Sequence, residues 1–356
     1  MAGLLPPPGK PNRPTRPVSL RRKRPSRRRG PHGDSFRYSS SGGPMSGPDF
    51  SVAVTPSGYR WWYLDGLSDD GTRGLTLIAF IGSVFSPYYA HARRRQKATV
   101  DPHQFCAINL ALYGPDRRAW AMTERSGRAL TRTETSFIVG PSALHWDGTT
   151  LRVSLDEITV PIPRRLRGEI RFQPATLTDW VEPLADHGEH RWAPLAPRGR
   201  MEIAFSRPGL SWSGQGYLDS NSGSKPLEEG FRHWTWARGD AGEDTLLCYD
   251  AVRRDGSPHR FMLKLDAEGQ VSRHPCPPRH GLKAGLWRVP LSVHGDPGSQ
   301  PRLLQRFEDT PFYNRSQVET TLEGKRLTMV NEGLDLDRFA KRWVQTLLPF
   351  RMPRRA

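Results

Sequence analysis

Two segments of the 356-residue chain carry carboxyl groups beside residues that could take part in acid–base chemistry. In residues 212–223, glycines flank an alternating row of Tyr217, Asp219 and Asn221. The two-residue period of a strand places these three side chains on one face. Turn formation explains the glycines and Asn221, but it explains Tyr217 beside Asp219 less well. The row is therefore a candidate site in which Asp219 is the acid.

The second carboxyl is that of Asp250, in residues 244–252, which have the composition of a strand. In a strand, Asp250 shares one face with three apolar side chains, those of Leu246, Cys248 and Val252. A carboxyl among apolar neighbours has a raised pKa and can stay protonated near neutral pH, so that it can act as a general acid. The alternative is that Asp250 ends the strand and faces solvent.

Aromatic side chains gather in two further segments. Residues 59–63 contain Tyr59, Trp61, Trp62 and Tyr63, and residues 231–238 contain Trp234 and Trp236 beside His233. Packing of strands in a core explains such clusters. They also have the composition of a π-rich wall, which contacts a polyene or stabilises a carbocation through the ring faces.

Other kinds of site lack their usual motifs. Residues 186–190 and 274–280 contain histidine with acidic or cysteine side chains, but neither spacing matches a known metal site. The chain has no phosphate-binding loop, dinucleotide fingerprint, Gly-x-Ser-x-Gly elbow or paired-cysteine motif. We therefore expect no metal.

The elements that would position these side chains are mostly short strands. The 34 glycines and 33 prolines favour many turns and few long helices. Apolar runs at 75–81 and 105–112 predict buried strands, and Asp-Gly pairs at 147–148 and 255–256 predict hairpins. The best helix candidate is 336–348. The pattern predicts an all-β protein of meandering antiparallel strands in barrels or sandwiches, which can hold an elongated apolar ligand.

Charge divides the chain into an arm and a body. Residues 1–50 hold eleven Lys and Arg against two Asp, a charge of +9, so the remaining residues carry +8 of the total +17. Residues 1–45 contain almost no core-forming side chains and are predicted to be a disordered basic arm. The arm could instead bind nucleic acid or anionic lipid, or be untranslated if synthesis starts at Met45. The basic body suits an anionic membrane surface as well as nucleic acid.

Cysteine content and hydropathy bear on the compartment. The three cysteines are Cys106, Cys248 and Cys276, and an odd number without a close pair fits a reducing compartment. The longest apolar stretch, residues 75–90, is too short for a spanning helix and is interrupted by glycine, serine and proline. We therefore expect neither a transmembrane segment nor a secretory signal.

Eight segments together resemble the carotenoid 1,2-hydratases, also called hydroxyneurosporene synthases. They are residues 59–89, 190–194, 212–223, 231–238, 247–250, 308–313, 334–339 and 347–353. The resemblance covers roughly residues 50–355 and implies two lipocalin-like β domains. On this basis we predict domains at 46–228 and 229–356, with the segment containing Tyr217, Asp219 and Asn221 near their junction.

The resemblance implies a reaction that needs no cofactor. Water is added to the terminal 1,2 double bond of acyclic carotenoids of the lycopene or neurosporene type, through a tertiary carbocation, giving the 1-hydroxy product. It implies Asp250, next to Tyr249, as the proton donor, with His233, Trp234 and Trp236 assisting. Asp219 is the rival acid, and the sequence leaves this choice open. The predicted substrate contacts are Tyr59, Trp61, Trp62, Tyr63, Tyr217 and Asn221.

A water-insoluble substrate and a basic body predict attachment to a membrane surface. We expect peripheral association with the cytoplasmic side of the inner or photosynthetic membrane. The body lacks a recognisable nucleic-acid-binding motif, so nucleic acid is not an expected partner. The alternative function is that of a non-catalytic, lipocalin-like carrier of carotenoid or lipid.

Overall fold

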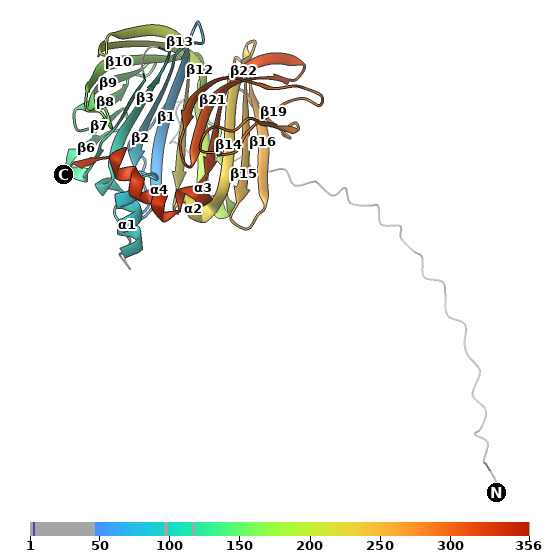
Figure 1. Cartoon of the computed structure of the whole chain (residues 1–356), viewed down its shortest axis with the longest axis horizontal. Helices are drawn as coiled ribbons and strands as arrows, with labels where there is room; N and C mark the ends of the chain where they lie inside the picture. The colour runs from blue at the N-terminus through green and yellow to red at the C-terminus, as the bar shows by residue number, and fades with distance from the viewer. Residues whose placement is uncertain (1–2, 4–46, 96–98, 116–117, 356) are drawn as a thin grey trace, which may run out of the picture. The chain divides into compact units, whose positions relative to one another are not determined.

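The structure is a computed structural model that describes residue 3 and residues 47–95, 99–115 and 118–355. The predicted basic arm at 1–45 lies, except for Gly3, outside the described residues. All elements below belong to one compact unit, residues 35–356. Strands make up most of this unit (Figure 1), which confirms the predicted all-β class.

The first sheet has fourteen strands. Twelve of them follow one path, in the order β23 (Arg354–Arg355), β5 (Glu124–Arg125), β3 (Cys106–Tyr113), β2 (Gly74–Ile81), β1 (Tyr59–Ser68), β13 (Leu210–Gly223), β12 (His190–Arg207), β10 (Arg165–Pro174), β9 (Leu151–Ile158), β8 (Ser142–Trp146), β7 (Ser136–Val139) and β6 (Leu130–Arg132). Off this path, β4 (Ala119–Met122) pairs with β3 and β11 (Glu182–Pro183) pairs with β12. Within this sheet the short pairing of β23 with β5 is parallel.

The second sheet has seven strands, all antiparallel. Their order is β17 (Val271–His274), β16 (Pro258–Leu265), β15 (Asp244–Arg253), β14 (Phe231–Ala241), β22 (Lys325–Asp335), β21 (Tyr313–Leu322) and β20 (Arg302–Asp309). A separate hairpin is formed by β18 (Arg279–Leu282) and β19 (Leu291–His294). The α-helices are short: α1 (Pro87–Arg95), α2 (Leu227–Gly230), α3 (Leu336–Phe339) and α4 (Arg342–Leu347).

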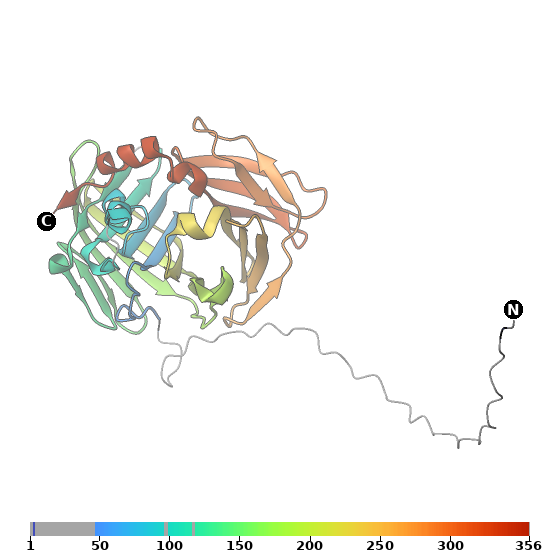
Figure 2. The same ribbon diagram turned by 90° about the horizontal axis from the view of Figure 1, so that it is seen from below.

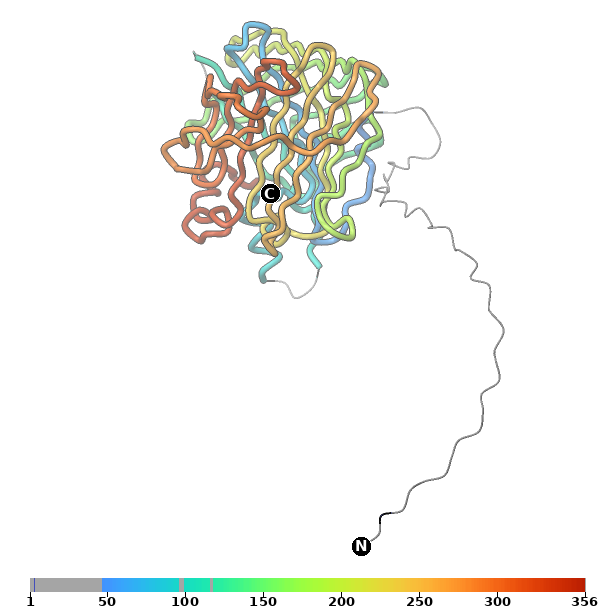
Figure 3. Tube along the Cα trace, turned by 90° about the vertical axis from the view of Figure 1, so that its right-hand side faces the viewer, coloured from blue at the N-terminus to red at the C-terminus, as the bar shows by residue number. Residues whose placement is uncertain are grey.

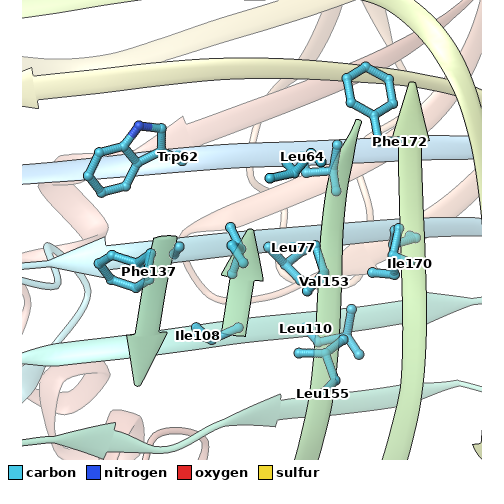
Figure 4. Close-up of a cluster of buried hydrophobic side chains, with 14 of the residues drawn as sticks. Trp62, Leu64, Leu77, Ile108, Leu110, Phe137, Val153, Leu155, Ile170 and Phe172 are labelled. Carbon is cyan, nitrogen blue, oxygen red and sulfur yellow. The ribbon is translucent and has the colours of Figure 1, made fainter. Parts of the chain in front are cut away.

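The first sheet curls back on itself around an apolar core. Figure 4 shows strands β7, β9 and β10 crossing β1, β2 and β3, with the side chains of both groups meeting between them. Trp62 and Leu64 of β1 point into this core, where Trp62 packs against Phe50 and Phe137. The alternation typical of a strand therefore gives β1 one face that is committed to the interior of the first sheet.

The other face of β1 contributes to a second core, which lies between the two sheets. Tyr59, Trp61 and Tyr63 point into it and meet aromatic side chains of the second sheet, including Trp234 and Trp236. Figure 3 shows the strands of the second sheet packed in front of those of the first. Because β1 is buried on both faces, it is the strand around which the two cores are built.

Most of the predicted strands are confirmed. The apolar runs at 75–81 and 105–112 form the interior strands β2 and β3. The two Asp-Gly pairs form the turns between β8 and β9 and between β15 and β16. Both turn glycines, Gly148 and Gly256, have positive φ values of 97° and 89°, which glycine adopts without steric cost.

The helices differ from expectation. The predicted helix at 336–348 is broken into α3 and α4, because Lys341 has an extended backbone (φ −65°, ψ 135°). The helix α1 was not predicted. No helix among the described residues is long and apolar enough to cross a membrane. The chain passes from the first sheet to the second between Gly223 and Phe231, around the predicted boundary at 228/229, and the division into two domains stays a prediction.

Candidate active site

A buried carboxyl lies at the centre of the face between the sheets. Asp219, on β13, is 5% exposed, and its Oδ2 accepts two hydrogen bonds. Trp192 Nε1 donates over 2.8 Å and the Tyr217 hydroxyl over 2.9 Å. The other carboxyl oxygen, Oδ1, is buried and has no hydrogen-bond partner among the described residues. A protonated carboxyl fits this arrangement, with a carbonyl oxygen that accepts both bonds and the proton on Oδ1.

Burial raises the pKa of Asp219 to about 8, because a charged carboxylate would lose its solvation there. The hydrogen bonds from Trp192 and Tyr217 act in the opposite direction and stabilise the charged form. The negative charges of Glu332 and Asp65 also contribute to the raised pKa. At neutral pH Asp219 is therefore mostly protonated, although an ordinary aspartate would be ionised.

Aromatic rings from both sheets surround this carboxyl. The Tyr217 ring lies 5.2 Å from that of Trp236 on β14 and 6.2 Å from that of Tyr63 on β1, centroid to centroid. Trp192, the second hydrogen-bond donor, lies 5.4 Å from Tyr249 on β15. The ring faces carry partial negative charge, so a cation formed beside Asp219 would be stabilised by electrostatics.

A buried ion network lies next to the carboxyl. Asp65 on the first sheet pairs with two arginines of the second, at 2.6 Å from Arg238 and 2.7 Å from Arg315. Arg315 also pairs with Glu332, which accepts a hydrogen bond of 2.7 Å from the Tyr63 hydroxyl. Two carboxylates thus face two guanidinium groups. The network joins the sheets without a net charge, and neither of its arginines forms an ion pair with Asp219.

An apolar cavity of about 310 Å³ lies on the same side of the first sheet. Its walls include Ile78 and Phe80 of β2, Phe312 near the start of β21, and Val344 of α4. Ile78 of β2 lies opposite Tyr63 of β1, and Tyr63 in turn lies opposite Asp219 of β13. Neighbouring strands are about 4.8 Å apart, so the wall at Ile78 is about 10 Å from Asp219 along the sheet. Tyr63 occupies the strand between them.

The family model of the carotenoid hydratase CrtC matches residues 77–356. This chain belongs to the carotenoid hydratase family. The acyclic carotenoid 1,2-hydratase of Thiocapsa roseopersicina is 47% identical over 338 residues, which cover 95% of this chain and 83% of the relative. That of Rubrivivax gelatinosus is 45% identical over 314 residues, covering 87% of this chain and 76% of the relative. The resemblance predicted from the sequence is confirmed.

A solved structure supports the fold of this hydratase-family chain. The protein from Nitrosomonas europaea that was given the name AttH superposes with a TM-score of 0.56. The match covers 85% of this chain and 98% of that protein, at 14% identity. At this identity the likeness concerns the fold alone, and it agrees with the predicted lipocalin-like architecture.

The other predicted acid of the hydratase-family chain has different surroundings. Asp250 is 2% exposed, but Arg260 donates to its Oδ1 over 2.7 Å, and its Oδ2 lies 3.4 Å from His294 Nε2. Arg279 is 3.6 Å away. Burial alone would raise the pKa of Asp250, yet the ion pair with His294 and the hydrogen bond from Arg260 outweigh it and hold the pKa below its usual value. The predicted raised pKa is wrong, because β16, β18 and β19 bring Arg260, Arg279 and His294 to that face.

Strand alternation separates the remaining predicted residues. Tyr249, Trp234 and Trp236 point into the core between the sheets, beside Tyr59, Trp61, Tyr63 and Tyr217. Asn221 is also on the Asp219 face, within hydrogen-bonding reach of Tyr249. His233 is exposed and does not reach this core. Trp62 lies in the other core, on the opposite face of β1, so it is not brought to the carboxyl.

Two residues of the site were not among the predicted site residues. Trp192 and His190 alternate at the start of β12, opposite Asn221 and Gly223 of β13. His190 is fully buried, its Nδ1 lies 2.9 Å from the Tyr59 hydroxyl, and burial lowers its pKa to about 4, so it is neutral. A Cβ atom at Gly223 would lie 2.5 Å from the Tyr59 ring and 2.7 Å from His190 Nδ1, which is too close for a side chain to fit there. The alternation of His190 and Trp192 was the signal that could have identified them.

Proposed function

We propose that the chain hydrates the terminal 1,2 double bond of acyclic carotenoids, with Asp219 as the proton donor. Family membership supports the class of reaction. One observation carries the assignment of the acid: Asp219 is buried with a pKa of about 8, and two donors hold Oδ2 while Oδ1 is left for the proton. Asp250 is not chosen, because Arg260 and His294 stabilise its charged form.

The proposed reaction begins with proton transfer from Oδ1 to the less substituted carbon of the double bond. The π electrons form the new C–H bond, and the positive charge stays on the tertiary carbon. The rings of Tyr217, Trp236 and Tyr63 stabilise this cation. The Trp192 and Tyr217 donors hold the carboxylate that the transfer leaves behind.

Water then adds to the tertiary carbon and gives an oxonium ion. The Asp219 carboxylate takes the excess proton, so the product is a tertiary alcohol and the acid is restored. The two steps add one water molecule in total and return Asp219 to its starting state.

The apolar cavity supports the choice of substrate. Its wall at Ile78 lies on the strand next to Tyr63, so a polyene that occupies it could bring one end to Asp219. Such a substrate resides in lipid, so we further propose that the protein works on the cytoplasmic side of the inner or photosynthetic membrane, attached peripherally. A non-catalytic carrier would not need a proton donor, so the neutral Asp219 carboxyl favours the hydratase over the carrier.

Isotope labelling tests the proposed reaction. Purified full-length protein is incubated with lycopene or neurosporene in ²H₂O or in H₂¹⁸O, without added cofactor, and products are analysed by mass spectrometry. We expect a monohydroxy product with one carbon-bound deuterium in the first case and one ¹⁸O atom in the second. A product without carbon-bound deuterium, or with oxygen from another source, would contradict the mechanism.

A further inference from the structure

Exposed apolar side chains are concentrated at one place on the surface. Five of the seven large hydrophobic residues that are exposed in the described part of the chain lie in α4 and in two adjoining segments. We call them the rim patch: Leu286 (87% exposed), Trp287 (40%), Trp343 (48%), Leu347 (45%) and Phe350 (72%). A cluster of this kind is unusual on a soluble surface and indicates an interaction site.

The rim patch lies at the entrance of the apolar cavity. Trp287 and Leu347 belong both to the patch and to the cavity wall. The rings of Trp287 and Trp343 stack with 6.0 Å between their centroids, which joins the two segments. Val344 and Leu348 of the same helical region are buried and line the cavity. Figure 2 shows these helices, in red, along the edge where the two sheets meet. The region from α4 to Phe350 therefore has one side on the cavity and one toward solvent.

Unpaired cations accompany the aromatic residues. Four basic side chains beside the patch are exposed and form no ion pair with any described carboxylate: Lys283, Arg288, Lys341 and Arg342. The nearest acids on the helical side, Asp335 and Asp337, pair with Arg338 and Arg254. On the side of Leu286, the Asp309 carboxyl accepts a hydrogen bond from the Leu286 N–H. The four cations outnumber this carboxylate around the apolar centre, which complements an anionic partner with an apolar interior.

We propose that the rim patch docks on an anionic lipid bilayer, so that the cavity opens toward the lipid. Trp287 and Trp343 suit the headgroup level, where amphipathic rings concentrate, and the four cations would face lipid phosphates. Leu347 and Phe350 would enter the acyl boundary. The proposal rests on the proposed function for the identity of the substrate. An acyclic carotenoid dissolved in the bilayer could then enter the cavity without crossing water.

Vesicle binding by full-length variants tests the docking surface. The patch variant carries Leu286→Ser, Trp343→Ser and Phe350→Ser, none of which lines the cavity. The matched control is Leu304→Ser, which removes an exposed leucine five residues along β20 from the cavity residue Asp309. On phosphatidylcholine vesicles containing phosphatidylglycerol, we expect co-sedimentation of the patch variant to be at least about tenfold weaker, and that of the control to be within about twofold of the original.

Turnover measured with carotenoid in detergent and with carotenoid in vesicles separates membrane docking from catalysis. The patch variant should hydrate detergent-solubilised carotenoid within about twofold of the original rate, but vesicle-embedded carotenoid at least about fivefold more slowly. If the original protein is inactive in both, the proposed function fails, while the vesicle-binding result still decides the docking surface. The docking proposal is overturned if the patch variant binds vesicles like the original, if the control loses as much binding, or if sedimentation shows that the patch joins two copies of the chain.

Discussion

Asp219 and Asp250 are both nearly inaccessible to water, yet they have opposite tendencies to ionise. Asp219 receives hydrogen bonds from two neutral donors and forms no ion pair with either arginine of the buried network, and burial raises its pKa to about 8. Asp250 contacts Arg260, Arg279 and His294, and its pKa is lowered. Burial therefore determines how costly a charge is, and the partner determines whether that cost is offset. These differences favour Asp219 as the proposed acid and a structural role for Asp250.

Replacing each carboxyl by its amide gives the sharpest contrast. Asp219→Asn keeps the shape and removes the proton, so turnover should fall by at least about a hundredfold, the lower range for a general acid. Asp250→Asn should reduce turnover by less than about tenfold, because Asp250 donates no proton in the proposed mechanism. Rates are measured on protein whose folding is checked by circular dichroism. Full activity in Asp219→Asn together with an inactive, folded Asp250→Asn would reverse the assignment.

The stability of the same two variants should rank the other way. Asp250→Asn leaves Arg260 and His294 without their anion, so we expect a loss of about 3 kcal/mol in the free energy of unfolding. Asp219→Asn should lose less than about 1.5 kcal/mol, since an amide oxygen can accept the same two hydrogen bonds. Urea denaturation at pH 7 measures both. Equal losses would show that the two carboxyls do not differ in structural role.

The pH dependence of turnover sharpens the comparison further. The pKa of Asp219 is raised by folding, so its protonated form is intact at low pH and is lost as the pH rises through about 8. Turnover should fall over the same pH range, which gives the pH–rate profile an alkaline limb.

Tyr217→Phe removes a hydrogen-bond donor that stabilises the Asp219 anion, so the pKa of Asp219 should rise and the alkaline limb should move to higher pH. The rate below the limb should fall by about fivefold, equivalent to roughly 1 kcal/mol for one hydrogen bond.

Tyr59→Phe is the control for this pH experiment. It removes a hydroxyl that is hydrogen-bonded to His190 instead of Asp219, so the alkaline limb should stay in place. A shift of the limb to lower pH in Tyr217→Phe, or an equal shift in both variants, would show that the limb does not report Asp219.

Local patterns predicted much of this molecule. Asp-Gly pairs identified two hairpins and apolar runs identified β2 and β3, because turn geometry and strand burial depend on neighbouring residues. The row of Tyr217 and Asp219 was identified for the same reason. The alternation within 59–63 also contained the information that Trp62 faces away from Trp61 and Tyr63, but the prediction grouped them.

Long-range contacts account for what was missed. Asp250 shares a strand face with Leu246 and Cys248, as predicted, but His294 reaches it from a hairpin more than forty residues further along the chain. Trp192 meets Asp219 only through the pairing of β12 with β13, which is interrupted by irregular register after Ala193. The alternation of His190 and Trp192 marks a strand face, but it does not show which residue that face contacts, so residue types alone could not decide between the two acids.

The ion network between the sheets has a consequence for how this sequence can change over time. Asp65 comes from the first sheet, whereas Arg238, Arg315 and Glu332 come from the second, and each charge is buried against another. Losing one member leaves an uncompensated charge in the interior, which is strongly destabilising. Single substitutions at these positions should therefore be eliminated by selection, whereas paired ones survive. Among relatives, a replacement of Asp65 is expected together with a replacement of an arginine, so that the four positions are inherited as one unit.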